Sequence, residues 1–265
     1  MAVAGSPISH SLSPLLHSTA YKILGIEAEF LSEEITEEKF GEFYFNAKNS
    51  GYRGLALTMP LKEVAFDYAD TCDELSTLTG AINTLVFGTE VSAFNTDVLG
   101  LVDALAEAGS KQISTGVVFG SGATARSTLV ALQRLGATEV NCVARNVSDV
   151  ERMAKVAHKI GVNFNHTSVS DSAWLTADVV VNTTPMGALD EIAREVYSPA
   201  GLLLDVVYNP WPTQLAASWA VTGGTIVCGL AMLLHQAGHQ VTLMTGKPAP
   251  VAQMREALNA ELLAR

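Results

Sequence analysis

Three polar residues in the first hundred positions, Lys62, Asn83 and Asp97, could together carry proton-transfer chemistry. We predict that each lies at an end of a strand or helix, which is where α/β enzymes hold their functional groups. A lysine can give a proton to an oxygen that becomes negative during a reaction, and a carboxylate can hold that lysine in place. Structural roles are the alternative, because Lys62 could be a solvated surface residue and Asp97 could cap the helix that follows it.

A second polar group occupies the loop at residues 5–14, G-S-P-I-S-H-S-L-S-P. Three serines and a histidine fall within five residues there, and their side chains could form a hydrogen-bonding wall for a hydroxylated ligand. Ser13 is also expected to be the N-cap of a helix that has Pro14 at its first position. Ser11 has no such structural role.

The segment G-V-V-F-G-S-G-A-T-A-R at residues 116–126 predicts a phosphate-binding turn between a buried strand and a helix. Gly120 allows the sharp turn, and Gly122 lets the backbone approach a pyrophosphate. Ala125 stands in place of a third glycine and is still small enough for close packing of the helix on the strand. The free N–H groups at the start of the helix would then face the phosphates.

About 20 residues beyond such a turn, an NAD site carries an acidic residue that binds the ribose 2′-hydroxyl. Here the corresponding place reads Ala144, Arg145 and Asn146, which offers an arginine and no carboxylate. Because a guanidinium suits a 2′-phosphate, the sequence favours NADP over NAD. Asp149 and Glu151 follow closely and weaken this inference slightly, and the alternative for Arg145 is a solvent-exposed loop residue.

Two histidines, His235 and His239, are four residues apart on a predicted helix and could in principle bind a metal. No third ligand at a suitable spacing accompanies them, so no metal site is predicted. Gln236 stands next to His235 and could reach a pocket with its uncharged polar side chain.

Hydrophobic periodicity and turn residues outline the elements that must position these groups. The predicted strands are 2–4, 27–32, 53–57, 85–88, 91–94, 117–119, 139–143, 177–181, 202–207 and 225–228, and the predicted helices are 14–24, 37–48, 61–68, 98–108, 123–135, 150–160, 229–243 and 249–263. Strands that alternate with helices indicate an α/β fold with a parallel, doubly wound sheet.

Composition sets limits on the class of protein. A chain of 265 residues allows one large or two ordinary domains, and its net charge of −11 argues against a nucleic-acid partner. Cys72, Cys142 and Cys228 are far apart and odd in number, so we expect buried, unpaired thiols in a reducing compartment. The first residues do not resemble a signal peptide, and apolar runs stay well short of the ~18 residues that span a membrane, so a cytoplasmic protein is expected.

Taken in order, these motifs resemble those of the shikimate dehydrogenase family of NADP-dependent enzymes, and the resemblance covers nearly the whole chain. The matching segments are residues 5–14, T-M-P-L-K at 58–62, G-A-I-N at 80–83, N-T-D at 95–97, N-T-T-P-M-G at 182–187 and Y-N-P at 208–210. Two segments differ from the family pattern. The usual G-A-G-G turn is G-S-G-A at 120–123, and the usual N-R-T is A-R-N at 144–146, with Asp149 where a basic residue is often found.

The resemblance implies a role for each candidate residue. Lys62 and Asp97 would be the catalytic pair, and Ser11, Ser13, Thr58, Asn83 and Gln236 would bind the substrate. The implied cofactor-binding residues are Gly120, Ser121, Gly122, Ala123, Thr124, Ala125, Arg145, Thr184, Pro185, Met186, Tyr208, Gly229 and Met232. It implies a substrate-binding domain of residues 1–97 and 229–265, an NADP-binding Rossmann domain of residues 98–228, and an active site in the cleft between them.

The implied activity is the reversible, NADPH-dependent reduction of 3-dehydroshikimate to shikimate, a step of the shikimate pathway that leads to chorismate and the aromatic amino acids. An NAD-preferring quinate/shikimate dehydrogenase is the nearest alternative. A non-catalytic NADP-sensing protein is a second one, but such a protein would have no use for Lys62 and Asp97. The expected partner is a small-molecule substrate, with neither nucleic acid nor membrane, and the expected assembly is a monomer or a homodimer.

Overall fold

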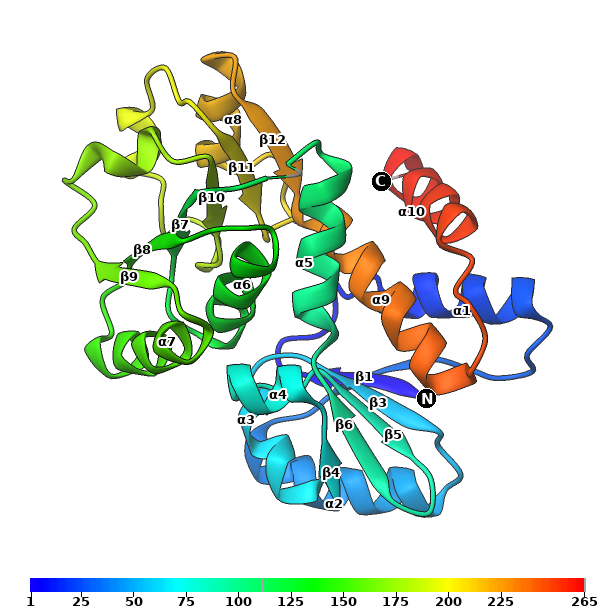
Figure 1. The fold of residues 1–265 in the computed structure, drawn as a ribbon. Coiled ribbons are helices and arrows are strands. Elements are labelled where there is room, and N and C mark those ends of the chain that lie inside the picture. The colour runs from blue at the N-terminus through cyan, green and yellow to red at the C-terminus, as the bar shows by residue number, and fades with distance from the viewer. Residues whose placement is uncertain (111, 265) are drawn as a thin grey trace. The chain divides into compact units, whose positions relative to one another are not determined.

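The computed structural model describes residues 1–110 and 112–264, and the chain forms two compact units (Figure 1). The first unit is Met1–Gly100 with Leu233–Arg265, and the second is Leu101–Met232. The first unit is therefore discontinuous in sequence, because the chain leaves it for the second unit and returns to it near the end.

The first unit is built on a six-stranded sheet in the order β2-β1-β3-β5-β6-β4. Its strands are β1 Ala2–Gly5, β2 Leu31–Glu34, β3 Gly54–Leu57, β4 Thr71–Cys72, β5 Thr84–Phe87 and β6 Val91–Phe94. The sheet is mixed: β1 runs parallel to β2 and β3, β5 is antiparallel to both β3 and β6, and β4 is parallel to β6.

Helices cover the sheet of the first unit. They are α1 Ser13–Leu24, α2 Glu37–Asn49, α3 Leu61–Val64 with a following 3₁₀ turn Ala65–Tyr68, α4 Glu74–Thr79 and α10 Val251–Ala264. Helix α5 Thr96–Glu107 begins in this unit, and helix α9 Gly229–Thr245 begins in the second unit and ends in this one. Helix α2 buries Phe40, Tyr44 and Ala47 in one core with Leu55 and Leu85 of the sheet. These apolar side chains are spaced three or four residues apart on α2, so they form one face of the helix.

The second unit contains a fully parallel six-stranded sheet in the order β12-β11-β10-β7-β8-β9. Its strands are β7 Thr115–Phe119, β8 Glu139–Val143, β9 Asn163–His166, β10 Val179–Asn182, β11 Leu202–Asp205 and β12 Thr225–Cys228, and its helices include α6 Ala123–Arg134, α7 Val147–Ile160 and α8 Gln214–Val221. This order is that of the doubly wound dinucleotide-binding fold, and it confirms the predicted α/β class. The order of connection reverses between β7 and β10, where such folds bind their ligands.

The structure corrects several details of the sequence prediction. Ser13 is not the N-cap of α1, because the helix starts at Ser13 and its cap residue is Leu12, without a side-chain cap bond. Asp97 is not the cap of α5, since Asn95 Oδ1 accepts the N–H groups of Asp97 and Val98. Cys142 is buried, but Cys72 is exposed on the short strand β4.

Other corrections concern element bounds. Strand β2 lies four residues beyond the predicted start, and β4, α4, β9 and α8 were not predicted. Each missed strand is short or polar, so it lacks the apolar run or strict alternation that marks a strand in sequence.

His17 is a fully buried histidine in the first unit. Its ring stacks on Phe30 with 3.8 Å between ring centroids, Nδ1 lies 3.0 Å from the Tyr21 hydroxyl, and Nε2 lies 3.2 Å from Gln240 Oε1. Loss of hydration on burial lowers the pKa of His17 to about 3. The ring is therefore neutral throughout the physiological range of pH.

This buried ring should make the first unit sensitive to acid. The unfolded chain protonates His17 near pH 6.5 and the folded chain does not, so stability is lost as pH falls below that value. Between pH 7 and pH 5 the loss should be ~2 kcal/mol. We expect the free energy of unfolding, measured with denaturant at pH 7 and at pH 5, to fall by ~2 kcal/mol less in His17→Gln than in the original protein. Equal losses in the two proteins would contradict the assignment.

Candidate active site

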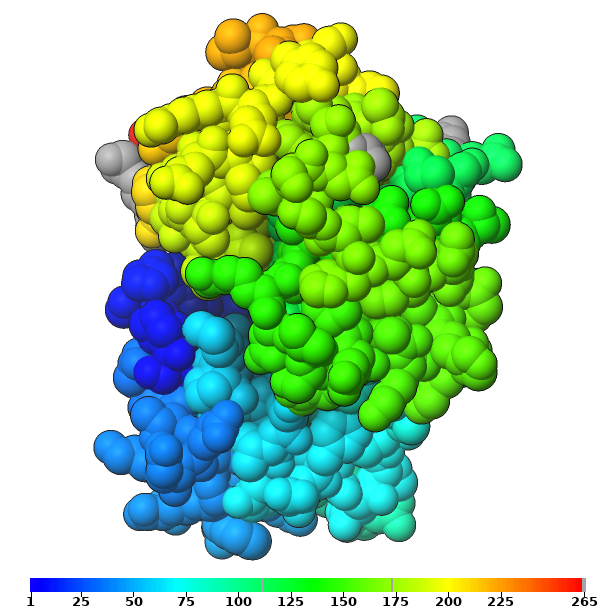
Figure 2. Space-filling view, turned by 90° about the vertical axis from the view of Figure 1, so that its left-hand side faces the viewer, coloured from blue at the N-terminus to red at the C-terminus, as the bar shows by residue number. Residues whose placement is uncertain are grey.

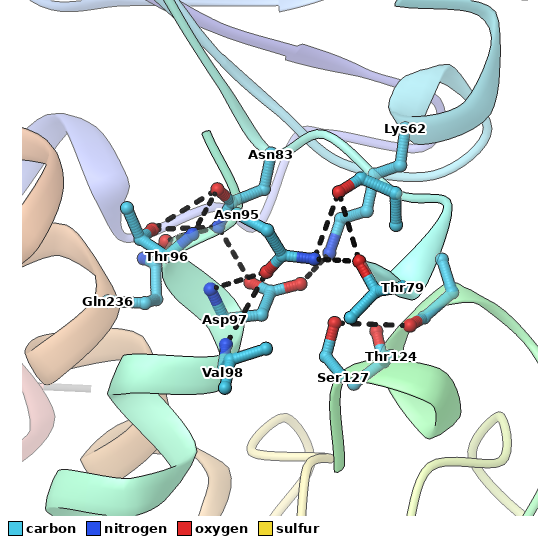
Figure 3. Close-up of polar contacts among 12 residues, drawn as sticks. Lys62, Thr79, Asn83, Asn95, Thr96, Asp97, Val98, Thr124, Ser127 and Gln236 are labelled. Atoms are coloured by element: carbon cyan, nitrogen blue, oxygen red, sulfur yellow. Dashed lines mark hydrogen bonds and ion pairs between the residues drawn. The ribbon is translucent and has the colours of Figure 1, made fainter. Parts of the chain in front are cut away.

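The centre of the candidate site is an ion pair between Lys62 Nζ and Asp97 Oδ2, 2.5 Å apart (Figure 3). Lys62 lies in the first turn of α3, which follows β3, and Asp97 lies in the first turn of α5, which follows β6. Both side chains are largely removed from water, with relative exposures of 12% and 5%. A pair of charges in such a place is retained only if its remaining polar atoms are also bonded.

Asn83 provides that support on the carboxylate side. Its Nδ2 donates to Asp97 Oδ1 and to Thr96 Oγ1, at 2.8 Å in each case (Figure 3). Its Oδ1 accepts the Thr96 N–H at 2.8 Å and the Thr84 hydroxyl at 2.8 Å. These partners fix which end of the amide faces Asp97, because the amide and carboxylate oxygens can only accept and the amide nitrogen can only donate.

Asn95 brings Asp97 to this place. It caps α5 with its side-chain oxygen, while its Nδ2 donates to Thr79 Oγ1 and to the Ala81 carbonyl, at 2.9 Å each. The turn before α5 is thereby tied to the segment after α4. The sequence analysis missed this role because Asn95 and Asp97 are both of the residue types that cap helices, two positions apart.

Gln236 reaches the same cluster from α9. Its side chain is buried, Nε2 donates to the Leu233 carbonyl at 2.9 Å, and Oε1 lies 3.4 Å from Asn83 Nδ2 (Figure 3). Helices α5 and α9 can approach this closely because residue 100 is glycine. A Cβ atom there would stand 2.7 Å from Gln236 Cβ, so Gly100 is required for packing.

The loop after β1 and the segment after β3 are joined to each other at the same edge of the sheet. A Cβ atom on Gly5 would lie 2.2 Å from Thr58 Cγ2, and the Ser6 N–H donates to the Met59 carbonyl at 2.9 Å. Thr58, a predicted substrate ligand, therefore lies directly against the start of the serine-containing loop.

Within that loop, Ser11 is partly exposed and Ser13 is buried. Ser11 Oγ accepts the Ser13 N–H at 3.3 Å. Glu34, which the sequence analysis missed, fixes the loop by accepting the Ser6 hydroxyl at 2.5 Å and the Ile8 N–H at 2.9 Å. These bonds lower the pKa of the Glu34 carboxyl.

In the second unit, the turn after β7 has the geometry that its glycines predict. Gly120 has a φ of +105°, and a Cβ atom there would be 2.4 Å from Thr183 Oγ1. Gly122 is the N-cap residue of α6 and has open space where its Cβ would be. Ala123, Thr124 and Ala125 form the first turn of α6, with Ala125 fully buried.

A pocket of about 710 Å³ lies beside this turn, at the carboxyl ends of β7, β8 and β10. Figure 2 shows the surface of this unit on the side of α7 and the segment after β10, in green to yellow. The residues that line the pocket are Phe119, Gly120, Ser121, Val143, Ala144, Arg145, Asn146, Thr167, Ser168, Val169, Thr184, Pro185, Ala188, Leu189 and Ile192. Among these described residues there is a guanidinium and no carboxylate. Such a lining suits the adenosine part of a dinucleotide that carries a 2′-phosphate.

Arg145 is exposed at the rim of this pocket. The acidic residue that follows it is engaged locally: Asp149 accepts a bond from Asn146 Nδ2 at 2.7 Å and forms an ion pair with Arg152. Asn146 also caps α7 with its side-chain oxygen. The carboxylate that weakened the sequence argument is thus partly neutralised by its own helix.

Thr184 is held by a buried network at the ends of β10 and β11. Asn182 Oδ1 accepts the N–H and the hydroxyl of Thr184, and Asn182 Nδ2 donates to Asp205 Oδ1 at 3.0 Å. Burial raises the pKa of Asp205, although bonds from Thr213, Asn182 and the Val207 N–H oppose that rise.

Eight predicted cofactor residues do not line the 710 Å³ pocket: Gly122, Ala123, Thr124 and Ala125 lie at the start of α6, and Met186, Tyr208, Gly229 and Met232 lie elsewhere in the chain. Met186 is exposed two residues beyond Thr184, and Tyr208 follows β11. Gly229 opens α9 where a Cβ atom would be 2.1 Å from the Val206 carbonyl oxygen, so this glycine is required for packing. Met232 is buried in the next turn of α9.

His235 and His239 both lie on α9. Across residues 1–110 and 112–264, no group of three or more histidine, cysteine or acidic side chains is arranged to hold a metal ion. Over the same residues, no helix is both long and apolar enough to cross a membrane.

A Rossmann unit with a phosphate-binding turn, together with a unit that carries a buried lysine–aspartate pair, defines an oxidoreductase that uses a pyridine nucleotide. Comparisons with known proteins identify the family. Residues 3–85 match the model of the shikimate dehydrogenase substrate binding domain, and residues 229–258 match that of the shikimate 5′-dehydrogenase C-terminal domain.

Full-length relatives agree with these matches. A protein of Oleidesulfovibrio alaskensis named shikimate dehydrogenase (NADP(+)) is 33% identical over 99% of this chain and 95% of its own length. The crystal structure of Mycobacterium tuberculosis shikimate dehydrogenase is 36% identical, with a TM-score of 0.88 and 98% of each chain covered. That of the Thermus thermophilus enzyme in complex with NADP(H) and shikimate is 28% identical, with a TM-score of 0.85 over 98% of each chain. The chain belongs to the shikimate dehydrogenase family, as its motifs predicted.

The two glycines of the turn should separate folding from cofactor binding. Gly122 has an ordinary extended φ of −75° and open space at its Cβ, so Gly122→Val should fold normally but weaken NADPH binding at least about tenfold by occupying the phosphate position. Gly120→Ala should instead cost about 1–3 kcal/mol of stability, because its φ is positive. Thermal unfolding and fluorescence titration with NADPH would measure both effects. Unchanged NADPH binding in Gly122→Val would rule out this turn as the phosphate site.

Proposed function

We propose that this protein catalyses the reversible reduction of 3-dehydroshikimate to shikimate with NADPH, and that Lys62 and Asp97 are its catalytic pair. The observation that carries the proposal is the largely buried ion pair between these two side chains, held by Asn83 at an end of the sheet. Burying two charges costs desolvation free energy, so an ion pair with only a structural role could be replaced by apolar residues. A reaction that creates an oxyanion instead requires a cation that can donate a proton.

The chemistry follows from what the two side chains can do. Reduction adds a hydride to the carbonyl carbon, and negative charge then develops on the carbonyl oxygen. Lys62 Nζ donates a proton to that oxygen during reduction, and it accepts the proton from the hydroxyl during oxidation. Asp97 accepts a bond from Lys62 Nζ and hydrogen-bonds the same substrate hydroxyl, so that lysine and substrate are held in one geometry.

The residues of the second unit fit NADPH, which supplies the hydride when bound. The open backbone at Gly122 and the N–H groups at the start of α6 suit the pyrophosphate. Arg145, exposed at the pocket rim, suits the 2′-phosphate. We assign the remaining cofactor contacts to Ser121, Ala123, Thr124, Ala125, Thr184, Pro185, Met186, Tyr208, Gly229 and Met232.

We assign substrate binding to the first unit and NADPH binding to the second. Ser11, Ser13, Thr58, Asn83 and Gln236 would bind the carboxylate and hydroxyls of shikimate. The support for this set is that Asn83 and Gln236 share the cluster of the catalytic pair, while Thr58 adjoins the serine-containing loop. The free thiols of Cys72, Cys142 and Cys228 agree with a reducing compartment, which supports a cytoplasmic enzyme, and we propose that it acts as a monomer or a homodimer.

Cofactor and substrate choice can be tested in one assay. Consumption of NADPH and NADH is followed in parallel with 3-dehydroshikimate and with 3-dehydroquinate. We expect 3-dehydroshikimate with NADPH to be the preferred pair, and Arg145→Ala to raise the KM for NADPH about tenfold or more, because a charge-assisted bond is typically worth ~1.5–3 kcal/mol. The KM for NADH should barely change. Equal use of both cofactors by the original protein would refute the role of Arg145.

The proton-transfer role predicts a specific kinetic change. Lys62→Met should lower kcat by at least ~10²-fold, because an interaction made in the transition state is lost. Binding of NADPH and of shikimate, measured by titration, should change little. A near-normal kcat in Lys62→Met would transfer the donor role to Asp97 or a bound water molecule. A chain that binds NADPH but oxidises none of it with either substrate would instead favour an NADP-sensing protein.

A further inference from the structure

A chain of buried hydrogen bonds runs from α1 through α9 to the back of the candidate site, entirely within the first unit. Its middle member is Gln240, which is only 2% exposed and lies one helical turn beyond Gln236. Gln240 Nε2 donates to the Asn83 carbonyl and to Thr84 Oγ1, at 3.1 Å each. Gln240 Oε1 lies 3.2 Å from His17 Nε2.

The direction of every bond in this chain can be assigned from donor and acceptor capacity. The Asn83 carbonyl can only accept, so the nitrogen of the Gln240 amide faces it, and the amide oxygen faces His17. His17 Nε2 therefore carries a hydrogen. Because the pKa of His17 is lowered to about 3 by burial, the ring is neutral and its Nδ1 is bare, so Nδ1 accepts the Tyr21 hydroxyl at 3.0 Å.

The same direction continues into the site. The Thr84 hydroxyl accepts from Gln240 and gives its own proton to Asn83 Oδ1 at 2.8 Å. With that oxygen occupied, Asn83 Nδ2 donates to Asp97 Oδ1 at 2.8 Å. Gln240 thus bonds both to the main chain of Asn83 and, through Thr84, to its side chain, which fixes the amide from two directions.

We propose that Gln240, oriented by His17, is a positioning residue that sets the Asn83 amide and through it the Asp97 carboxylate. The inference rests on the proposed function, since it assigns Gln240 to the geometry of that reaction. Gln240 itself contacts neither Lys62 nor Asp97 in the described contacts; its effect passes through Asn83 and Thr84. Without its two donated bonds, Asn83 would keep its place in the sheet but lose the partners that fix its amide orientation.

A volume-matched substitution tests this role. Gln240→Met keeps the length of the side chain but can donate no hydrogen bond, and we expect it to lower kcat/KM for shikimate about tenfold, because Asn83 loses the two bonds that orient its amide. NADPH binding, measured by fluorescence titration, should stay within about twofold of the original protein, because the turn and pocket that suit it belong to the second unit.

The matched control is Val241→Ala, which removes apolar volume at the neighbouring buried position of α9 and leaves the chain of buried hydrogen bonds intact. If Gln240 acts only through packing, the two variants should lose stability and shikimate activity in parallel. If it positions Asn83, only Gln240→Met should lose shikimate activity beyond what its thermal unfolding explains. An unaltered kcat/KM in Gln240→Met, or an equal loss in Val241→Ala, would overturn the proposal.

Three further variants keep the test decisive if Gln240→Met does not fold. Thr84→Val has nearly the same shape as the original residue and removes only the hydroxyl between Gln240 and Asn83, so it should reproduce the loss in kcat/KM. His17→Gln retains an N–H donor toward Gln240 and should keep most activity, whereas His17→Leu should not. Normal activity in both Thr84→Val and His17→Leu would also overturn the proposal. If the original protein oxidises no shikimate with NADP⁺, the proposed function itself fails, which is a distinct outcome.

Discussion

The buried ion pair between Lys62 and Asp97 is the interaction on which the first unit is organised. Two charges with side-chain exposures of 12% and 5% have lost most of their hydration, and their mutual attraction offsets that loss only with good geometry and further bonds. The fold supplies these from separate segments: α3 holds the lysine, the cap of α5 holds the carboxylate, and the residue before β5 holds the carboxylate's second oxygen. Removal of either charged side chain would leave the other as a buried charge without its partner.

The two units place their candidate functional groups by the same rule. In the first, Thr58 follows β3 and the serine-containing loop follows β1; in the second, the glycine turn follows β7, Arg145 follows β8 and Thr184 follows β10. The strands β1 and β3 are parallel neighbours, as are β7, β8 and β10, so their carboxyl ends meet at one edge of each sheet. Residues separated by many positions in sequence therefore converge, and the rigid sheets fix their spacing.

Sequence patterns predicted much of this arrangement because strong local signals coincide with the elements. The strands β6, β8 and β12 begin and end where predicted, since apolar or β-branched runs there are bounded by turn residues. The doubly wound order followed from the alternation of strands with helices. The strands β4 and β9 were missed because they lack such an apolar run. Strand β4 has only two residues, and β9, N-F-N-H, lies at the edge of its sheet and has little apolar content.

Candidate site residues could be named from sequence where they stand in a motif, but not where only distant packing brings them to the cluster. Lys62 and Asp97 stand in recognisable segments, although they lie 35 positions apart. Asn95 and Asp97 could each have capped α5. Asn95 is the cap because Lys62 and Asn83 bind the side chain of Asp97. Gln240 bonds Thr84 across 156 positions of sequence, so its role could not be predicted from local pattern. Its signal was only its place one turn from Gln236 on α9.

The position of α9 gives a physical reason for the discontinuous first unit. This helix brings Gln236 to the side chain of Asn83 and Gln240 to its main chain, and glycine at position 100 allows α5 to pack against it. All of the groups that α9 contributes to the network are neutral amides. An uncharged support suits this place, because a further buried charge would compete with Lys62 for Asp97 and would require a partner of its own. The returning helix thus fixes the amide that holds the carboxylate and adds no charge of its own to the pair formed by Lys62 and Asp97.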